Sequence, residues 1–305
     1  MVKYLIEEHH DCETGCCTAT WARYVLAGAT TTFTETVCPT PGEMMPFFAS
    51  MQQVEVTEDD LTYSATISPD GSRALIVVET TEPVPALKLG DWESEAEKFY
   101  QGWIIYRDGS SPLPLFYTVE DMFRFQWAPD SRHLIIDAYC YGGEGILVQG
   151  IGLLVVDVDS SVTYTIADEY YGLCEGSISY QVAPDSRHLI YEPGIVATLD
   201  GSEQVRVCDE GREARSYTWS QDGQYAYVAC FTSRAEPDTL SRYDTQTGEN
   251  LILAGPDCGL TFKAIEMAVS PGQTHVAFVW GNTTFMPVEP YGVWMLDLTL
   301  ANGCQ

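Results

Sequence analysis

One ten-residue pattern, centred on a Pro-Asp pair, constrains the fold of this chain more than any other feature. Its five copies occupy residues 67–76, 127–136, 182–191, 219–228 and 269–278. The second and third copies share the run Ala-Pro-Asp-Ser-Arg-His-Leu-Ile letter for letter. Such identity within one chain indicates an internal repeat, so we expect a fold built from repeated units.

Each copy has the pattern of a strand, a tight turn and a second strand. Before the turn, large apolar residues alternate with small or polar ones, as at Phe125 and Trp127, which is the period of a strand. Proline at the second turn position fixes φ, and the Asp, Gly or Ser that follows suits a turn. After the turn comes an almost continuous apolar run, which is typical of a strand covered on both faces.

The spacing of the copies indicates a β-propeller. Measured at positions 69, 129, 184, 221 and 271, neighbouring copies lie 60, 55, 37 and 50 residues apart. Units of roughly 40–50 residues with four strands each are typical of propeller blades. A third strand, usually ending in Asp, is expected at residues 102–108, 152–157, 194–200, 240–244 and 292–297. A fourth is expected at residues 113–119, 162–166, 204–207 and 250–254.

The fifth unit lacks room for its fourth strand, because only seven residues follow Leu298. Residues 53–57 precede the first copy much as residues 115–119 precede the second. We therefore predict that this N-terminal strand completes the last blade and closes the ring, since closure removes exposed strand edges. Residues 51–305 then form the propeller. Residues 1–50, with two expected strands at 21–27 and 30–37, form a Cys-rich extension or a degenerate sixth blade.

The motif resembles that of the TolB-like β-propellers, relatives of the WD-repeat propellers. The resemblance rests on Ser-Pro-Asp-Gly between an innermost and a second strand, followed by a Gly-to-Asp apolar strand, and covers about residues 53–299. It implies an all-β propeller of four-stranded blades, with five recognisable repeats in five or six blades. Gln221 replaces the proline in the fourth copy and the fifth copy lacks the Asp, so looser turns are expected there. The resemblance implies little about function, because propellers serve enzymes, scaffolds and binders alike.

The chain is strongly acidic, since 44 Asp and Glu against 15 Lys and Arg give a net charge of −29. A field of that sign repels nucleic acid and anionic lipid, so neither is expected as a partner. It favours cationic partners, divalent ions such as Ca²⁺, or salt-rich surroundings, although a solubilising surface is the ordinary interpretation and no cofactor is assigned. No apolar run is long enough for membrane insertion, and residues 1–8 lack the apolar stretch of a signal peptide.

The ten cysteines indicate disulfides and an oxidising compartment, extracellular or periplasmic, and the chain would then be a processed or partial product. The candidates are Cys12, Cys16, Cys17, Cys38, Cys140, Cys174, Cys208, Cys230, Cys258 and Cys304. In a propeller, Cys140 and Cys230 end second strands, while Cys174 and Cys208 lie at or after outer strands on the same face. The preferred pairs are therefore Cys140 with Cys174 and Cys208 with Cys230.

Two stretches carry residue types that metals prefer. His9 and His10 lie near several of the N-terminal cysteines, and imidazole with thiolate suits zinc or copper. Disulfides with exposed histidines are the ordinary interpretation, so no metal site is assigned. Residues 157–161 faintly resemble alternating calcium ligands, but without the glycine and distal Glu of an EF-hand loop a plain turn is favoured.

Long loops between second and third strands carry aromatic residues that would share one face of the propeller. They are Trp92, Tyr100, Tyr139, Tyr141, Phe231, Phe285 and Tyr291. They could form a contact surface for a protein or a glycan, or they could pack the loops onto the disc. In the longest of these loops, residues 79–102, the composition of residues 91–100 favours a short helix. Asn282 begins a glycosylation sequon in another of these loops.

The sequence shows no motif for a reaction. His133, His188 and His275 share one repeat position, where the second strand opens, and this repetition indicates a structural role. No nucleophile elbow, zinc-protease, P-loop or Rossmann motif is present. The leading interpretation is a non-catalytic extracellular module for protein binding or self-association, including strand addition by an N-terminal arm. The alternative is an enzyme, such as a glycoside hydrolase or lyase, with its site at the central channel.

Overall fold

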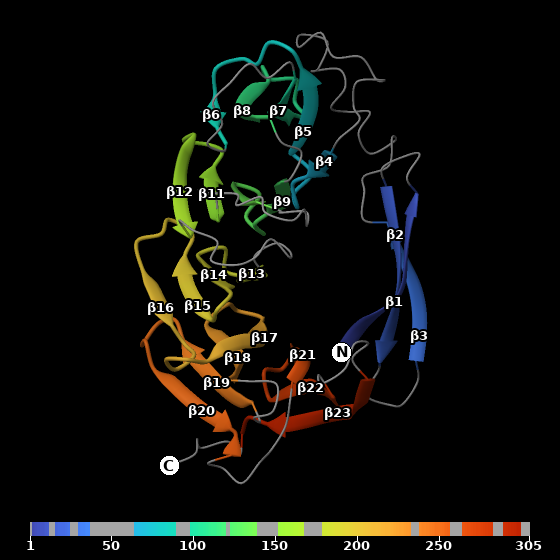
Figure 1. Cartoon of the computed structure of the whole chain (residues 1–305), viewed down its shortest axis with the longest axis vertical. Helices are drawn as coiled ribbons and strands as arrows, with labels where there is room; N and C mark the ends of the chain where they lie inside the picture. Colours follow the sequence, from blue (N-terminus) through green and yellow to red (C-terminus); the bar gives the residue numbers. More distant parts are fainter. Residues whose placement is uncertain are drawn as a thin grey trace. The chain divides into compact units, whose positions relative to one another are not determined.

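The computed structural model of this protein is all-β in the parts that it describes (Figure 1). The described residues are 2–11, 16–24, 30–36, 64–89, 98–119, 123–138, 152–167, 179–232, 238–256, 264–282 and 289–299. Five small sheets coincide with the five repeats and are called the first to fifth sheets in chain order. The chain divides into two compact units. The N-half contains Ile6–Thr20 and Thr34–Ile178, and the C-half contains Met1–Leu5, Trp21–Phe33 and Ser179–Gln305.

The first sheet, in the N-half, has five strands in the order β4–β5–β7–β8–β6. They are β4 (Ser64–Ile67), β5 (Arg73–Thr80), β6 (Leu87–Lys88), β7 (Phe99–Tyr106) and β8 (Leu113–Thr118). Neighbouring strands are antiparallel, except that β6 runs parallel to β8 at the outer edge. Part of the predicted loop at residues 79–102 is therefore strand.

The helix expected at residues 91–100 is wrong at its C-terminal end. Phe99 and Tyr100 are the first residues of β7 and pair with Thr80 and Glu79 of β5. Aromatic residues favour strands, and pairing with a neighbouring strand overrides a weak local helical preference. Residues 90–97 lie outside the described residues.

The second, third and fourth sheets each contain four antiparallel strands, and strands consecutive in the chain are neighbours. The second sheet contains β9 (Phe123–Trp127), β10 (His133–Ala138), β11 (Leu153–Asp157) and β12 (Val162–Ala167). The third contains β13 (Tyr180–Val182), β14 (His188–Tyr191), β15 (Ile195–Thr198) and β16 (Gln204–Arg206). The fourth contains β17 (Glu213–Trp219), β18 (Tyr225–Phe231), β19 (Thr239–Asp244) and β20 (Asn250–Ala254). The predicted third and fourth strands of these units are confirmed within a few residues.

The fifth sheet has three described strands, β21 (Ala264–Val269), β22 (His275–Asn282) and β23 (Glu289–Asp297). Residues 53–57, predicted to complete this sheet, lie outside the described residues. A further three-stranded sheet is formed by β1 (Val2–Asp11), β2 (Cys16–Tyr24) and β3 (Thr30–Thr36), and is called the N-terminal sheet. Its β3 matches the strand expected at residues 30–37, β2 begins at Cys16 and only overlaps the strand expected at residues 21–27, and β1 has no counterpart among the predicted strands.

The five Pro-Asp turns share one backbone conformation. In each turn one N–H donates to the carbonyl three residues earlier at 2.8–3.0 Å, as from Gly71 to Ser68 and from Gln273 to Ser270. The donor residue has a φ between 54° and 75° in all five copies. The looser turns expected in the fourth and fifth copies are therefore wrong. In the fifth copy, which lacks the Asp, the Ser270 hydroxyl accepts the N–H groups of Thr274 and His275, at 3.1 Å each, as the Ser68 hydroxyl of the first copy accepts the N–H of Arg73.

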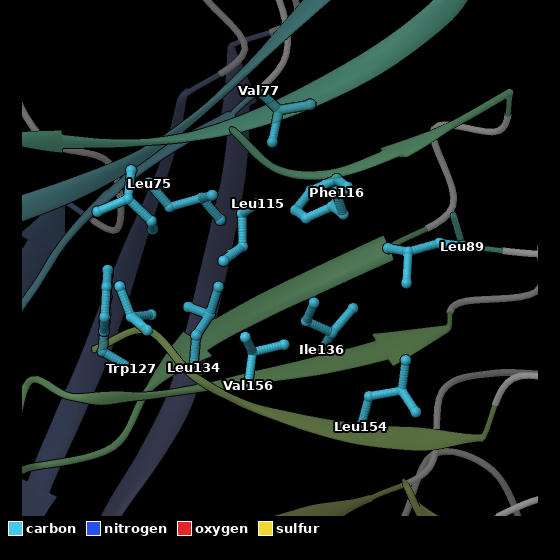
Figure 2. Packing of buried hydrophobic residues seen from close by; sticks show 12 residues of the cluster. Leu75, Val77, Leu89, Leu115, Phe116, Trp127, Leu134, Ile136, Leu154 and Val156 are labelled. Atoms are coloured by element: carbon cyan, nitrogen blue, oxygen red, sulfur yellow. The ribbon is translucent and has the colours of Figure 1, made fainter. Parts of the chain in front are cut away.

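Sheets that are neighbours in the chain pack face to face within each unit. In the N-half, Leu75 of the first sheet and Leu134 of the second belong to one buried apolar cluster (Figure 2). In the C-half, two such clusters join the third sheet to the fourth and the fourth to the fifth. The second strand β5 is buried at every position from Ala74 to Val78, which confirms that it is covered on both faces.

Two tryptophans at the same repeat position each donate a hydrogen bond to the neighbouring sheet, and this contact is called the tryptophan tie. Trp127 donates its indole N–H to the carbonyl of Thr66 in the first sheet, at 3.2 Å. Trp219 donates in the same way to the carbonyl of Gln181 in the third sheet, at 3.1 Å. Both tryptophans are buried, so each contributes apolar contact and one directional bond between neighbouring sheets.

Candidate functional site

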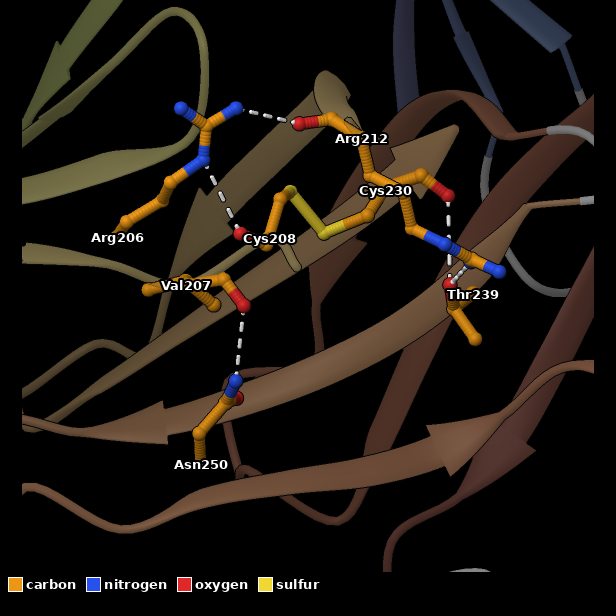
Figure 3. Close-up of a disulfide and its surroundings, with 7 residues drawn as sticks. All are labelled: Arg206, Val207, Cys208, Arg212, Cys230, Thr239 and Asn250. Atoms are coloured by element: carbon orange, nitrogen blue, oxygen red, sulfur yellow. Dashed lines mark hydrogen bonds between the residues drawn. A yellow bond between two sulfur atoms is a disulfide. The ribbon is translucent and has the colours of Figure 1, made fainter. Parts of the chain in front are cut away.

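A disulfide joins the third sheet to the fourth at the end of the sheets opposite the Pro-Asp turns, which is called the loop end (Figure 3). Cys208 follows β16 and Cys230 lies in β18, with their Cα atoms 5.6 Å apart and both side chains buried. The predicted pair is thus confirmed. The Arg206 guanidinium donates to the carbonyls of Cys208, at 3.3 Å, and Arg212, at 2.8 Å, and so braces the segment between β16 and β17.

Two more side chains attach this segment to the fourth sheet (Figure 3). Asn250 Nδ2 donates to the carbonyl of Val207 at 2.8 Å. Arg212 donates from Nη1 to the hydroxyl of Thr239, a buried residue of β19. Since buried backbone groups need partners, these contacts hold the segment in place as well as satisfying its polar atoms.

The contact between the third and fourth sheets around this disulfide is called the third–fourth junction. The tight turn after β14, at residues 192–194, adds two backbone hydrogen bonds to it. Its Pro193 carbonyl accepts the N–H of Ala214 in β17 at 3.1 Å, and its Gly194 carbonyl accepts the N–H of Val207 at 2.9 Å. Gly194 has a φ of 104°, and a Cβ there would lie 2.8 Å from Cys208 Sγ, so the position requires glycine.

Carboxylates gather at the surface of this junction. Glu192 and Glu213 stand next to the hydrogen-bonded Pro193 and Ala214, one on each sheet. Burial and the negative charge of Glu213 raise the pKa of Glu192. Asp209, Glu210 and Glu213 are exposed. Such a group of carboxylates can pair with cationic groups, and a carboxyl group with a raised pKa is a candidate acid–base group.

A hydroxyl pair lies on the inner strands of the same two sheets. The Ser179 hydroxyl, just before β13, is 2.6 Å from the phenolic oxygen of Tyr217 in β17. The Ser179 carbonyl accepts the N–H of Glu192 at 3.0 Å, so Ser179 is connected to the carboxylate-bearing turn.

The aromatic residues predicted to form one contact surface are only partly described. Phe231 ends β18 at the junction, half-buried and opposite Glu213 in strand register. Tyr100 lies in the N-half and packs against the apolar cluster of the first and second sheets, which fits the packing alternative. Tyr291 lies in β23. Trp92, Tyr139, Tyr141 and Phe285 lie outside the described residues.

Two of the other predicted disulfide cysteines and the predicted glycosylation residue lie in strands. Cys16 and Cys17 lie in β2, and Asn282 is the last residue of strand β22, paired with Glu289, so Asn282 itself is not in a loop as predicted. The cysteines outside the described residues are Cys12, Cys38, Cys140, Cys174, Cys258 and Cys304.

In the N-half, an ion pair at the turn end joins the first sheet to the second. Arg73 of the first sheet pairs with Asp159 of the second at 2.7 Å. Arg132 contacts both oxygens of Asp157, at 2.9 and 2.5 Å, and these bonds hold the pKa of Asp157 well below its usual range. The Asp157 carboxylate also accepts from Ser160. The stretch that faintly resembled calcium ligands is therefore a turn with an arginine as its counter-ion.

Among the described residues, no group of three or more His, Cys, Asp and Glu residues is arranged to hold a metal ion. In the same part of the chain, no helix has the length and apolar character needed to cross a bilayer. His133 and His188 open β10 and β14, with a ring nitrogen 2.7 and 2.8 Å from the Asp of the preceding turn, as their structural interpretation predicts.

Sequence reasoning missed the carboxylates and hydroxyls of the third–fourth junction. Glu192 and Glu213 are separated by 21 positions (213 minus 192) and match no motif. The tryptophan ties had a visible signal, since Trp127 and Trp219 hold the same repeat position, but nothing in the sequence marks the carbonyls that they reach.

No protein-family model and no curated protein matches this chain. An oligogalacturonate lyase structure from Vibrio parahaemolyticus is similar at 10% identity and a TM-score of 0.44, covering 99% of this chain and 84% of that one. A putative TolB structure from Agrobacterium tumefaciens is similar at 15% identity and 0.35, covering 83% and 81%. An acylaminoacyl peptidase from Pyrococcus horikoshii is similar at 11% and 0.41, covering 97% and 46%. The chain thus has structural similarity to β-propeller proteins.

Proposed function

We propose that this chain is a non-catalytic binding module of the extracellular or periplasmic space, which engages a protein partner at the third–fourth junction. One observation carries the proposal: exposed carboxylates stand beside a segment that a disulfide and cross-sheet hydrogen bonds hold in place. A surface that is already ordered loses little conformational entropy when it binds, so more of the contact energy appears as affinity.

The charge of the junction indicates the kind of partner. Asp209, Glu210 and Glu213 present negative charge to solvent beside the positive guanidinium groups of Arg206 and Arg212, and these carboxylates can pair with a basic protein surface. The net charge of −29 on the chain would steer a basic partner toward it and repel a second copy of the same chain. Phe231, half-buried beside these groups, would add apolar contact.

The proposal includes a closed propeller as the scaffold. In it, the five repeat sheets surround one axis, and residues 53–57 supply the fourth strand of the fifth sheet. The shared turn conformation and the face-to-face packing within each unit support this arrangement.

The test compares two matched pairs of substitutions on the full chain. E210Q/E213Q removes two exposed carboxylates at the junction, while E203Q/E249Q removes two exposed carboxylates from turns at the opposite end of the same sheets. Proteins secreted or displayed by the source organism are passed over each immobilised variant and quantified by mass spectrometry. We expect basic proteins to be retained by the wild type and by E203Q/E249Q and to be lost with E210Q/E213Q. Equal retention by all three would reject the junction as the binding surface.

A second candidate is an enzyme, and the carboxylates Glu192 and Glu213 are the observation that favours it. A carboxyl group with a raised pKa beside an ionised one resembles the acid and base needed for glycoside cleavage. A panel of polysaccharides would reveal activity as new reducing ends or as absorbance of an unsaturated product. Activity that E192Q abolishes and E249Q leaves intact would favour the enzyme, whereas activity that survives in E192Q would exclude this pair as its site.

A further inference from the structure

The first sheet differs from the other repeat sheets by its fifth strand, β6. This strand lies in the connection between β5 and β7, which pair directly with each other, so a four-stranded sheet is complete without it. It runs parallel to β8, whereas the other neighbours in this sheet are antiparallel. In the described part of the chain, no strand is added in this way to the outer strands β12, β16 and β20. We therefore regard β6 as a segment laid on the edge of a finished sheet.

The contacts of β6 are those of a peptide bound at a sheet edge. Its two residues are in register with Phe116 and Tyr117 of β8. The N–H of Leu89, the next residue, donates to the carbonyl of Tyr117 at 2.9 Å. Leu89 is buried and Leu87 half-buried, whereas Lys88 between them is exposed. In strand addition, main-chain hydrogen bonds supply affinity and pockets for alternate side chains supply specificity, and β6 has both kinds of contact.

The surroundings of β6 are apolar. Leu87 and Leu89 pack in the cluster between the first and second sheets, which also contains Phe116 and Leu154 (Figure 2). No residue of β8 is charged. The outer edge of β8, with the part of this cluster that receives the two leucines, is called the edge site. It is suited to an extended segment with two apolar side chains at alternate positions.

The attachment of β6 to the edge site is short. Two residues pair with a strand of six, and Pro83 and Pro85 just before them have no backbone N–H to donate. Of residues 81–89, Leu89 alone is buried. Segments with few hydrogen bonds and few buried side chains open at a lower free energy than the core of a domain does. A longer strand that replaced β6 would pair with more of β8 and gain hydrogen bonds.

We propose that the edge site binds an extended segment of a partner protein, with two leucine-sized apolar residues two positions apart, and that β6 is the internal competitor of this segment. The partner strand runs parallel to β8 in the place of β6. A second copy of the chain is a poorer occupant, because two chains with a net charge of −29 repel each other. This inference does not depend on the proposed function, since the edge site lies in the N-half and takes apolar residues.

A peptide with the sequence of residues 84–91 tests the site in trans. Its binding to the full chain is measured by the fluorescence anisotropy of a label at its N-terminus. In L87S/L89S, β6 loses its apolar anchors and the site is open in more molecules, so the peptide should bind about tenfold more tightly than to the wild type. V84S changes an exposed residue of the same connection and should bind the peptide as the wild type does.

A peptide with serine at both leucine positions should bind to none of these proteins. Equal affinity of the leucine peptide for the wild type and L87S/L89S, or binding to neither, would overturn the proposal.

Hydrogen exchange shows whether the variant releases β6 from a folded sheet. In L87S/L89S, the amide of residue 89 should lose protection while β5 keeps it. A second measurement uses the wild-type chain and so does not depend on how the variant folds. A peptide with p-benzoylphenylalanine at the Lys88 position should crosslink to residues 113–118, since Lys88 is in register with Tyr117. Crosslinks confined to other segments, or no crosslink, would contradict the proposal.

Discussion

The first–second and third–fourth sheet pairs use the same repeat and the same tryptophan tie, but different cross-links. The first–second pair is joined by Arg73 and Asp159, side by side at the turn end. The third–fourth pair is joined by the disulfide Cys208–Cys230 at the loop end. An ion pair with a half-exposed partner exchanges with water and is screened by salt, whereas a disulfide is not. The comparison shows that a repeat sets which sheets meet, while residues outside the repeat set how firmly a particular junction is held.

Removing the disulfide should produce the largest difference in stability between the two sheet pairs. C208A/C230A opens a covalent loop with a sequence separation of 22 residues, which should lower the free energy of unfolding of the C-half by about 3 kcal/mol. Urea unfolding would measure this loss of free energy. Hydrogen exchange would locate it, with protection falling in β18 and not in β10. A loss shared equally by both strands would mean that the disulfide does not act locally.

The next largest loss of stability should come from replacing the two tryptophans, and it should be the same in the two sheet pairs. Trp127→Phe and Trp219→Phe each keep an aromatic ring but remove the indole N–H and leave a backbone carbonyl without its donor. Each should cost about 2 kcal/mol, measured as the urea midpoint of the unit that carries it. A much larger cost at one site would show that the two ties are not equivalent.

Acid should act on the second sheet through Asp157. Its pKa in the folded protein lies below the ordinary 3.8, because Arg132 and Ser160 bind the carboxylate. The resulting stability is present above pH about 4 and is lost as pH falls toward the folded pKa. Asp157→Asn should lower stability at pH 7 and flatten this part of the pH profile. A profile unchanged by Asp157→Asn would assign the acid sensitivity to other carboxylates.

The smallest effect on stability is the pH dependence expected from Glu192, and its direction is opposite to that expected from Asp157. Burial and Glu213 raise its folded pKa, so the folded state holds the proton more tightly than the unfolded chain does. The stability from this group is present below the unfolded pKa and is lost as pH rises through the folded pKa. Glu213→Gln should move the Glu192 titration to lower pH, observed by NMR of its side-chain carboxyl carbon. A titration unmoved by Glu213→Gln would mean that burial alone causes the shift.

The strands were predictable because their signals are local. Alternation at Phe125 and Trp127, the turn at Pro129-Asp130 and the apolar run that follows are all decided within ten residues, and the structure contains them. The helix expected at residues 91–100 failed at Phe99 and Tyr100, because a partner strand distant in sequence outweighed local propensity.

The junctions were less predictable because their signals are not local. The pair Cys208–Cys230 could be found once strand positions were assigned to a propeller, since topology then limits which cysteines meet. Glu192 and Glu213 could not, because no spacing rule marks two carboxylates that approach through a turn on one sheet and the first residue of a strand on the next.

The most direct test of the account is the retention of partner proteins by C208A/C230A. If the third–fourth junction binds because it is held in place, this variant should retain about tenfold less of the basic proteins that the wild type captures, while E203Q/E249Q retains them fully. If C208A/C230A retains as much of these proteins as the wild type does, the claim that the disulfide-linked third–fourth junction is the binding surface is contradicted.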